Sequence, residues 1–511
     1  MSSLTGAGAA IEASDGQRDE KRDDKRYVTI FFAVILILTA LRILALAVNA
    51  TDLYTDEAQY WVWGQEPAFG YYSKPPLLAL ILTATSTVCG DSEFCTRLPS
   101  PLFYLVASAA VYFTAAKLYS HRIAFWSALA FATLPGISLS SQISSTDVPL
   151  LLLWSLALLV LVRLLERPTF ALAILLGLSI GIGLNAKYAM AYFVLCAVIY
   201  AALAPSAFSR VRWAHLLCAS VVVMALITPN LVWNANHSFA TFVHTSDNAK
   251  WQGSLFHPDK AAAFLGAQFG VFGPILFGAL LTLLLGYARG RERPAKQDLL
   301  LLAFSVPIIA IVTVQGFLSR AHENWAATAY VAASILVVAA LIRNGATTWL
   351  RASFAVNLAV MGLVAVGGAF AGQFRLPGGH DPFARTLGNR EIAAIVREAV
   401  RSGNLNGSPF AAILSDERGT SAALLYYGRD LRVPLYEWRG DGRPKNHFQL
   451  TRPYGPSAPR PVLLVSVSPE PKEITSSFTD VRSIGTRDVK AGQFTTRKAY
   501  LFYLDGLKVE K

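Results

Sequence analysis

Residues 28–61 read VTIFFAVILILTALRILALAVNATDLYTDEAQYW, and this stretch decides the class of fold. The first 22 residues, 28–49, carry a single charge and are long enough to cross a bilayer, which takes about 20 apolar residues. Acidic and aromatic residues follow directly, a pattern typical of the membrane–water boundary. The stretch therefore predicts a spanning helix followed by a polar loop at the membrane surface.

The rest of the chain repeats the apolar half of this pattern. Of the 511 residues, 54% are hydrophobic and 15% are charged, whereas an ordinary soluble chain carries about 25% charged residues. About 9% of residues 27–372 are charged, against about 25% of residues 373–511. This distribution excludes a single soluble enzyme. It predicts a disordered cytoplasmic arm over 1–26, a transmembrane domain over 27–372 and a folded domain over 373–511.

Apolar runs of spanning length recur through the transmembrane domain. The shorter run 75–90 opens with a double proline and is predicted to be an interfacial or re-entrant helix. The eleven candidate spans are approximately 28–49, 101–119, 122–140, 147–164, 170–184, 188–204, 214–233, 262–287, 298–316, 325–342 and 352–372.

The distribution of Lys and Arg predicts the orientation of these spans. With the N-terminus in the cytoplasm, 17 of these residues lie on the cytoplasmic side and 6 in the opposite loops, as the positive-inside rule requires. With eleven spans the C-terminal domain lies outside, in the periplasm of a Gram-negative inner membrane. The net charge of +12 is then explained by topology and anionic lipids, and no basic run interleaved with aromatics predicts a nucleic-acid partner.

The C-terminal domain reads as a small α/β fold. Helical periodicity covers 389–402, and the apolar runs 411–415 and 461–467 are typical of buried strands. No nucleotide-binding or nucleophile motif occurs there, so a lid or docking role is the simplest interpretation. Cys89 and Cys95 share an outward loop, where an oxidising compartment would allow a disulfide; the sequence leaves this open.

Chemistry is best sought in the first outward loop, 50–100. Asp56 and Glu57 directly follow a spanning helix, where partial desolvation raises the proton affinity of a carboxylate and suits it to general-base catalysis. The alternative is that these acids only start an interfacial helix. Lys74, held between Tyr72 and a double proline, is suited to binding a phosphate, although it could instead be a lysine that snorkels to the interface.

Three further polar motifs lie in outward loops: Asp147 in SSTDVP, Lys187 in NAKY, and the segment 320–325, RAHENW. Asp147 could be a helix cap, and the last segment could be a simple polar turn. Because all these motifs fall on one side of the membrane, they could converge on one cavity. Such a cavity would suit a substrate with a phosphate headgroup at the interface and a lipid tail in the bilayer.

With these motifs in order, the chain resembles the polytopic GT-C glycosyltransferases of the protein-O-mannosyltransferase and aminoarabinose-transferase group. The resemblance rests on YTDEAQY (54–60), KPPL (74–77), TDVPL (146–150) and NAKY (185–188), and covers about residues 28–340. It is closest to the bacterial lipopolysaccharide-modifying members. It implies a GT-C fold and an inverting transfer from a polyprenyl-phosphate sugar to a lipid or glycan acceptor in the external leaflet.

The resemblance also implies roles for individual residues. Asp56 would be the general base or the carboxylate that orients the acceptor, with Asp147 and Glu57 as further acids of the site. Donor-phosphate contacts would come from Lys74, Lys187, Arg320 and His322, and sugar or acceptor contacts from Tyr54, Tyr60, Tyr72, Glu323 and Asn324. The aminoarabinose transferases have a metal-linked acid directly before Lys-Pro-Pro, where this chain has Ser73. We therefore expect no required metal cofactor, with a divalent ion as the alternative.

Two other functions remain open at this point. A transporter or flippase of a lipid-linked saccharide would carry charges within its spans, where Arg42 is the clearest candidate. A membrane assembly factor would work through its C-terminal domain. For an enzyme, lipid A or lipopolysaccharide core is the first choice of acceptor, followed by protein hydroxyls and another envelope glycan. An acidic sugar such as galacturonate would suit Arg320 and His322, but a phosphate would suit them equally.

Overall fold

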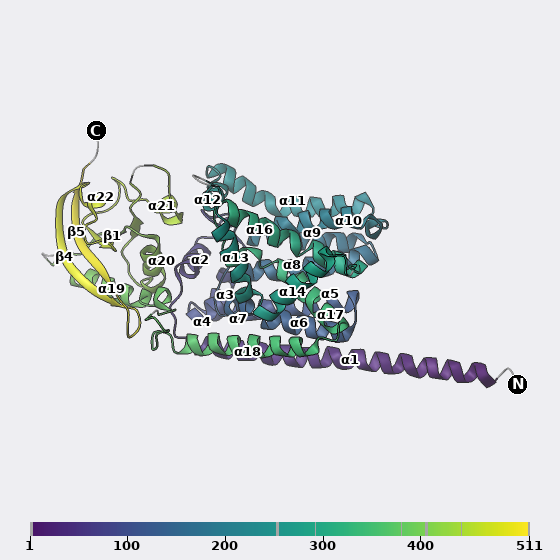
Figure 1. Cartoon of the computed structure of the whole chain (residues 1–511). Coiled ribbons are helices and arrows are strands. Elements are labelled where there is room, and N and C mark those ends of the chain that lie inside the picture. Colours follow the sequence, from purple (N-terminus) through teal and green to yellow (C-terminus); the bar gives the residue numbers. More distant parts are fainter. Residues whose placement is uncertain are drawn as a thin grey trace. The chain divides into compact units, whose positions relative to one another are not determined.

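The computed structural model describes residues 4–251, 255–291, 293–379, 381–403, 407–440 and 442–508, with side chains from residue 23 onward. The chain is mostly helical and carries one β-sheet near its C-terminus (Figure 1). It divides into two compact units. Unit 1 contains Met1–Leu44, Ser100–Pro229 and Ala249–Val364, and unit 2 contains Ala45–Pro99, Asn230–Asn248 and Ala365–Lys511.

Unit 1 is a helical assembly with an aromatic core. Trp154 of α8 is fully buried next to Phe193 of α10, and Phe193 in turn contacts Phe304, with ring centroids 5.2 and 4.8 Å apart. The helices are α1 (Leu4–Ala47), α5 (Pro99–Leu118), α6 (His121–Thr133), α7 (Pro135–Ser140), α8 (Asp147–Glu166), α9 (Phe170–Ala186), α10 (Ala191–Leu203), α11 (Trp213–Asn236), α13 (Pro258–Val271), α14 (Pro274–Ala288), α15 (Lys296–Ala303), α16 (Val306–Leu318), α17 (Ala329–Arg343) and α18 (Thr347–Ala369), with short 3₁₀ turns η1 (Tyr188–Met190), η2 (Pro205–Phe208) and η3 (Glu323–Ala326). Of these, α1, α11 and α18 continue into unit 2.

Six helical stretches of the described residues are long and apolar enough to cross a membrane: Asp23–Ala47, Glu93–Leu118, Asp147–Glu166, Trp213–Asn236, Lys296–Leu318 and Thr347–Ala369. Five shorter apolar helices accompany them: Leu77–Cys89, Phe170–Ala186, Tyr188–Leu203, Pro274–Ala288 and Ala329–Arg343. The polytopic helical architecture expected from the sequence is confirmed. The count of eleven spans stays a prediction.

Three of the expected spans are broken near a proline. Each break leaves a proline in the first turn of the next helix, where a missing N–H costs least and the fixed φ suits a helix start. The broken runs are 122–140, which forms α6 and α7, 262–287, which forms α13 and α14, and 298–316, which forms α15 and α16.

The first helix is longer than expected. We expected a disordered arm to residue 26 and a span from residue 28, whereas α1 is a single helix from Leu4 to Ala47. The charged residues that precede the apolar run include Lys, Arg and Glu, which have high helix propensity. An apolar helix that starts near residue 28 can therefore extend backward through them.

The C-terminal part of unit 2 contains a five-stranded sheet in the order β2-β1-β3-β5-β4. β1 (Ala412–Ser415) pairs in parallel with β2 (Leu435–Glu437) and β3 (Val462–Ser466). β5 (Thr496–Leu507) pairs antiparallel with β3 and β4 (Phe478–Lys490), the two long strands drawn in yellow in Figure 1. Strands were expected over 411–415 and 461–467 and a helix over 389–402, and all three are present, so the α/β interpretation is confirmed.

Both faces of the sheet are covered. Ile413 and Leu463 pack beneath α19 (Asn389–Ser402) and α20 (Arg418–Tyr427), whereas Leu414 and Leu464 pack with Tyr454, Ile474 and Phe478 on the other face. Because successive side chains point to opposite faces, a strand covered on both sides must be apolar throughout. Short helical elements complete this part: η4 (Ala384–Thr386), α21 (His447–Thr451) and α22 (Lys472–Thr475).

The first outward loop belongs to the same compact unit. It forms α2 (Thr55–Gln65), α3 (Leu77–Cys89) and α4 (Glu93–Arg97), and α12 (Ala240–Ala249) lies largely in this unit as well. α2 is buried between α3 and α20 in one apolar cluster, in which the rings of Trp63 and Tyr71 stack 4.6 Å apart. The helix expected over 75–90 is present as α3. This packing fixes α2 in place, and α2 carries the first candidate residues.

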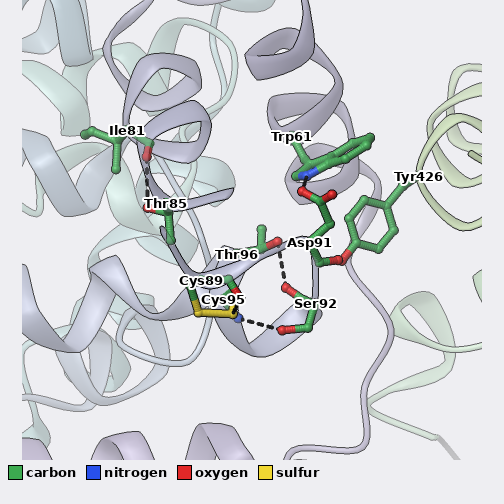
Figure 2. Close-up of a disulfide and its surroundings, with 9 residues drawn as sticks. All are labelled: Trp61, Ile81, Thr85, Cys89, Asp91, Ser92, Cys95, Thr96 and Tyr426. Carbon is green, nitrogen blue, oxygen red and sulfur yellow. Dashed lines mark hydrogen bonds between the residues drawn. A yellow bond between two sulfur atoms is a disulfide. The ribbon is translucent and has the colours of Figure 1, made fainter. Parts of the chain in front are cut away.

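A disulfide joins Cys89 and Cys95 at the end of α3, which answers the question that the sequence left open (Figure 2). Asp91 lies in the short segment that the disulfide closes. Its carboxylate accepts a hydrogen bond from Trp61 Nε1 at 2.9 Å, and its carbonyl accepts one from Tyr426 Oη at 2.5 Å. The closed segment thus connects α2 with the C-terminal part of unit 2.

Candidate active site

Asp56 and Glu57 lie side by side in the first turn of α2, as the sequence suggested. Tyr54 is the N-cap residue, and its backbone N–H donates to Oε2 of Glu57 at 2.9 Å. In many helices the side chain of the third residue accepts a hydrogen bond from the backbone N–H of the N-cap residue, and this contact stabilises the helix start. The helix start therefore uses Glu57 and leaves the Asp56 carboxylate available for other contacts.

Glu57 is buried in an ion pair with Arg97. The Nε and Nη2 atoms of Arg97 donate to Oε1 and Oε2 of Glu57 at 2.9 and 2.8 Å, and both side chains are at most 3% exposed. Arg97 also donates to the backbone carbonyls of Thr51 and Asp52. This enclosed arrangement suits a positioning role, and the catalytic role expected for Glu57 stays a prediction.

Asp56 is half exposed and pairs with Arg418, the first residue of α20. Nη1 of Arg418 donates to Oδ1 of Asp56 at 2.7 Å and to Oε1 of Gln59 at 3.3 Å. The two helices approach closely here. A Cβ added to Gly419 would lie 3.2 Å from the side-chain oxygen of Thr55 and 2.9 Å from the carboxylate of Glu417. Glycine at 419 thus permits the contact that places Arg418 on Asp56.

Lys74 belongs to the same group of charges. Burial, together with the positive charges of Lys74 and Arg418, lowers the pKa of His244 to about 4, against the opposing charges of Asp247 and Asp56. His244 is therefore neutral at physiological pH. Because an amide NH₂ can only donate, the Nδ2 group of Asn248, 2.9 Å away, makes Nε2 of His244 an acceptor.

Tyr72 completes this neighbourhood. Its ring lies 5.3 Å from that of His244, and its hydroxyl donates to the carbonyl of Pro444 at 2.9 Å. The segment is anchored on the neighbouring residues, because the N–H of Tyr71 donates to the carbonyl of Lys74 and Thr241 donates to the carbonyl of Tyr71. The electrostatic neighbours of Arg418 also include Tyr54 and Tyr60. Five expected residues therefore gather in unit 2: Tyr54, Asp56, Tyr60, Tyr72 and Lys74.

A second group forms within unit 1. Asp147, in the first turn of α8, accepts a hydrogen bond from Nζ of Lys187 at 2.6 Å and another from Nδ2 of Asn324 at 2.6 Å. The three motifs are far apart in sequence, so their meeting supports the expectation that they act together. Convergence of this group with that of unit 2 on one cavity stays a prediction.

The remaining expected residues surround Asn324. Glu323 starts the 3₁₀ turn η3, and its carbonyl accepts a hydrogen bond from Gln268. His322 is exposed, with its ring 5.2 Å from that of Trp325, and the carbonyl of Arg320 accepts a hydrogen bond from Gln315. None of these contacts assigns a function to the three side chains.

The residues present do not form a metal site of the kind linked to the aminoarabinose transferases. Ser73 stands before Lys74 in place of an acid. Among the described residues, no three His, Cys, Asp or Glu side chains are grouped so that they could hold a metal ion. The expectation that no metal is required remains to be tested in solution.

The sequence did not identify Arg418 and His244. Arg418 starts a helix 362 residues after Asp56, in a domain whose sequence carries no catalytic motif. The only signal was the excess of Lys and Arg over Asp and Glu in residues 373–511. His244 lies in the polar HTSDN run of an outward loop, and that polarity was its only mark.

Known proteins resemble this chain over most of its length. The sequence profile of the family described as dolichyl-phosphate-mannose-protein mannosyltransferase matches residues 73–233. Lipid A galacturonosyltransferase RgtD of Rhizobium johnstonii is 35% identical over 420 residues, which cover 81% of this chain and 86% of that protein. The lipopolysaccharide core galacturonosyltransferase RgtA of the same organism is 30% identical over 293 residues, covering 54% of this chain and 57% of the relative.

Solved structures agree with the fold. ArnT from Cupriavidus metallidurans bound to undecaprenyl phosphate matches with a TM-score of 0.64 at 16% identity, over 95% of this chain and 99% of that one. The apo form of ArnT matches with a TM-score of 0.62. The two galacturonosyltransferase relatives and the span-length helices together identify a multi-pass membrane enzyme. The chain belongs to the GT-C glycosyltransferases of the bacterial lipopolysaccharide-modifying branch, the family that includes lipid A galacturonosyltransferase RgtD.

Proposed function

We propose that the protein transfers a galacturonosyl residue from a polyprenyl-phosphate donor to lipid A or lipopolysaccharide core, with inversion, on the periplasmic side of the inner membrane. The names of RgtD and RgtA support the sugar and the acceptor. The undecaprenyl phosphate bound to ArnT supports the class of donor. The observation that carries the proposal is the group of Asp56, Arg418, Lys74 and His244 within one unit.

The reaction requires a base and a stabilised leaving group. An acceptor hydroxyl attacks the anomeric carbon and forms the new glycosidic bond. The bond from that carbon to the phosphate oxygen breaks, and its electron pair leaves with the phosphate. The hydroxyl proton goes to a carboxylate, for which the half-exposed Asp56 is better placed than the enclosed Glu57. The polyprenyl phosphate gains one negative charge, which a nearby cation must stabilise.

Lys74 is the proposed cation for the leaving phosphate. Its backbone is held by the hydrogen bond from Tyr71, and a double proline follows it. An ammonium group is a compact point charge that binds a phosphate without a fixed orientation. Lys187 and Asn324, both on Asp147, are proposed to hold a second polar part of the substrates.

Two observations support a periplasmic location of the first outward loop. Disulfides persist in oxidising compartments, and Cys89 and Cys95 form one in this loop. The distribution of Lys and Arg independently places the cytoplasm on the other side. Unit 2, which holds the loop and the C-terminal domain, would then lie in the periplasm.

Mass spectrometry of lipid A and core from cells with and without the gene tests the function. We expect deletion to remove one galacturonosyl residue, and a plasmid copy of the wild type to restore it. An Asp56→Asn copy should fail to restore it while accumulating in the membrane at a normal level. A deletion strain with unchanged lipid A and core would reject the proposed acceptor.

Lys74→Ala tests the role of the lysine. We expect its transfer rate to fall roughly 10²–10³-fold, the usual loss for one electrostatic contact to a developing charge. Steady-state kinetics with each substrate varied in turn should show that donor use suffers more than acceptor use. Equal losses for donor and acceptor would instead indicate a structural lysine.

A further inference from the structure

Arg418 follows the central parallel strand of the C-terminal sheet. The chain passes from β1 through α20 to β2 on one side of β1, and later returns as β3 on the other side. Open α/β sheets with such a reversal of strand order carry their binding sites at the carboxyl ends of these strands. Arg418 lies three residues after Ser415, the last residue of β1, and so occupies this edge.

Among the described residues, the hydrogen bonds of the Arg418 side chain use one of its three guanidinium nitrogens. Both of its hydrogen bonds to Asp56 and Gln59 run through Nη1. Nε and Nη2 form the planar fork that binds a carboxylate through two parallel hydrogen bonds. The side chain is 37% exposed, so a ligand can reach it. Arg97, by contrast, already uses its whole guanidinium within unit 2.

Two cations among the charges around His244 suit a donor with two negative groups. Lys74 and Arg418 are positive, while Asp56 and Asp247 are negative, and Asp247 is paired with Arg443 at 2.9 Å. A polyprenyl-phosphate donor with a neutral sugar carries one charge, on its phosphate. A uronic acid adds a second charge, on its carboxylate. Lys74 suits the first, and Arg418 has the geometry for the second.

We propose that Arg418 binds the carboxylate of the donor's uronic acid, and that this exchange releases Asp56 to accept the proton of the acceptor hydroxyl. The inference rests on the proposed function and adds a residue that determines specificity for acidic sugars. Oδ1 of Asp56 accepts a hydrogen bond from Nη1 of Arg418. Replacing one carboxylate by another on the same guanidinium preserves the ion pair. The fork also offers the incoming carboxylate a two-point contact.

A pair of matched donors tests this inference: polyprenyl-phosphate galacturonate and polyprenyl-phosphate galactose, which differ only at C6. Wild-type protein should prefer the uronate donor. For Arg418→Gln, we expect kcat/KM with the uronate donor to fall about 10²-fold, as when one partner of a buried charge contact is removed. Its kcat/KM with the galactose donor should not fall and is expected to rise, because that donor has no carboxylate to lose and Asp56 no longer has to be released from Arg418. Arg418→Lys keeps the charge but loses the planar fork. Its kcat/KM with the uronate donor should therefore fall by an intermediate amount, mainly through a higher KM.

Arg452→Gln is the matched control. Arg452 is another arginine of the C-terminal domain, paired with Glu66 at the opposite end of α2. We expect Arg452→Gln to leave kcat/KM unchanged with both donors. Binding of the uronate donor without acceptor gives an independent measurement. Asp56→Asn removes the competing carboxylate, so it should bind this donor more tightly than wild type, with a smaller gain for the galactose donor.

Equal losses for the two donors in Arg418→Gln would overturn the inference alone, because Arg418 would then act only through Asp56. Equal gains for the two donors in Asp56→Asn would overturn the exchange. A wild type that cannot use the uronate donor would overturn the proposed function together with the inference.

Discussion

Two arginine–carboxylate pairs start at neighbouring residues of α2 and differ in their surroundings. Glu57 and Arg97 are almost fully buried, at 3% and 2% exposure of their side chains, whereas Asp56 and Arg418 are 42% and 37% exposed. Successive residues of a helix point about 100° apart, so one acid faces the interior and the next faces an accessible surface. The same chemical pair therefore stabilises the loop at one position and is open to substrate at the other.

Removing the base should have the largest effect. Asp56→Asn keeps the size of the side chain but cannot accept the proton, so we expect transfer to fall about 10³-fold or more. Its thermal unfolding should match that of the wild type, because the Asp56–Arg418 pair is half exposed and such pairs add little stability. Turnover close to the wild-type rate, measured with purified protein, would remove Asp56 from the role of base.

Breaking the buried pair should affect stability instead. Glu57→Gln leaves the charge of Arg97 buried without its counter-ion, which costs about 3–5 kcal/mol of unfolding free energy. A thermal unfolding series with Glu57→Gln, Arg97→Gln and the double variant measures this. We expect the double variant to lose less than the sum of the single losses. A stable Glu57→Gln protein that lost transfer as completely as Asp56→Asn would reverse the contrast between the two acids.

Acidification should weaken the packing behind both acids. Burial lowers the pKa of His447 to about 3, helped by the charges of Arg452 and His237, and its ring contacts those of Trp63 and Tyr71. An unfolded histidine has a pKa near 6.5, so the unfolded chain binds one more proton between about pH 3 and 6.5. The contribution of the neutral His447 ring to the free energy of unfolding is therefore fully present above about pH 6.5, and it falls as the pH decreases through this window.

At pH 5 this single group should cost about 2 kcal/mol relative to neutral pH. His447→Phe keeps an aromatic ring and removes the titration. Unfolding temperatures measured from pH 7.5 to 5 should therefore fall less steeply for the variant. Parallel curves for the two proteins would show that His447 is not held neutral.

The smallest effect is expected at a helix cap. Oδ2 of Asp52 accepts hydrogen bonds from the N–H groups of Asn389 and Arg390 at 2.9 and 3.1 Å, so it caps α19 from a distant part of the chain. Asp52→Ala should cost about 1 kcal/mol, and Asp52→Asn, which keeps an acceptor oxygen, should cost less. Thermal unfolding of the two variants provides the measurement, and identical losses would indicate that the charge of Asp52, and not its acceptor oxygen, stabilises the start of α19.

Much of the fold follows from local patterns that the sequence displays directly. Apolar length marks the membrane helices, and the continuous apolar runs of β1 and β3 mark strands covered on both faces. The breaks near Pro135, Pro274 and Pro307 were also readable, because proline favours the first turn of a helix. Hydropathy alone joins such pieces, since it measures the composition of a run and not its hydrogen bonds.

The candidate site was predictable only in part. Lys187 and Asn324, which contact Asp147, could be grouped with it because the sequence predicts their loops on one side of the membrane. The sequence could not distinguish the buried Glu57 from the half-exposed Asp56, because their burial depends on which face of α2 packs against the rest of unit 2. Nor could it place Arg418, because its position is set by the sheet and by the close approach at Gly419.

The discontinuity of unit 2 has a consequence for the synthesis of the enzyme. Asp56 and Arg418 are separated by 362 residues. At the usual rate of 5–20 residues per second, roughly 20 to 70 s pass between the appearance of the first and of the second. By the end of that interval the nascent chain holds its first loop and its membrane helices. Until then it lacks the arginine partner of its proposed base, so the first loop enters the membrane well before the group around Asp56 can be completed.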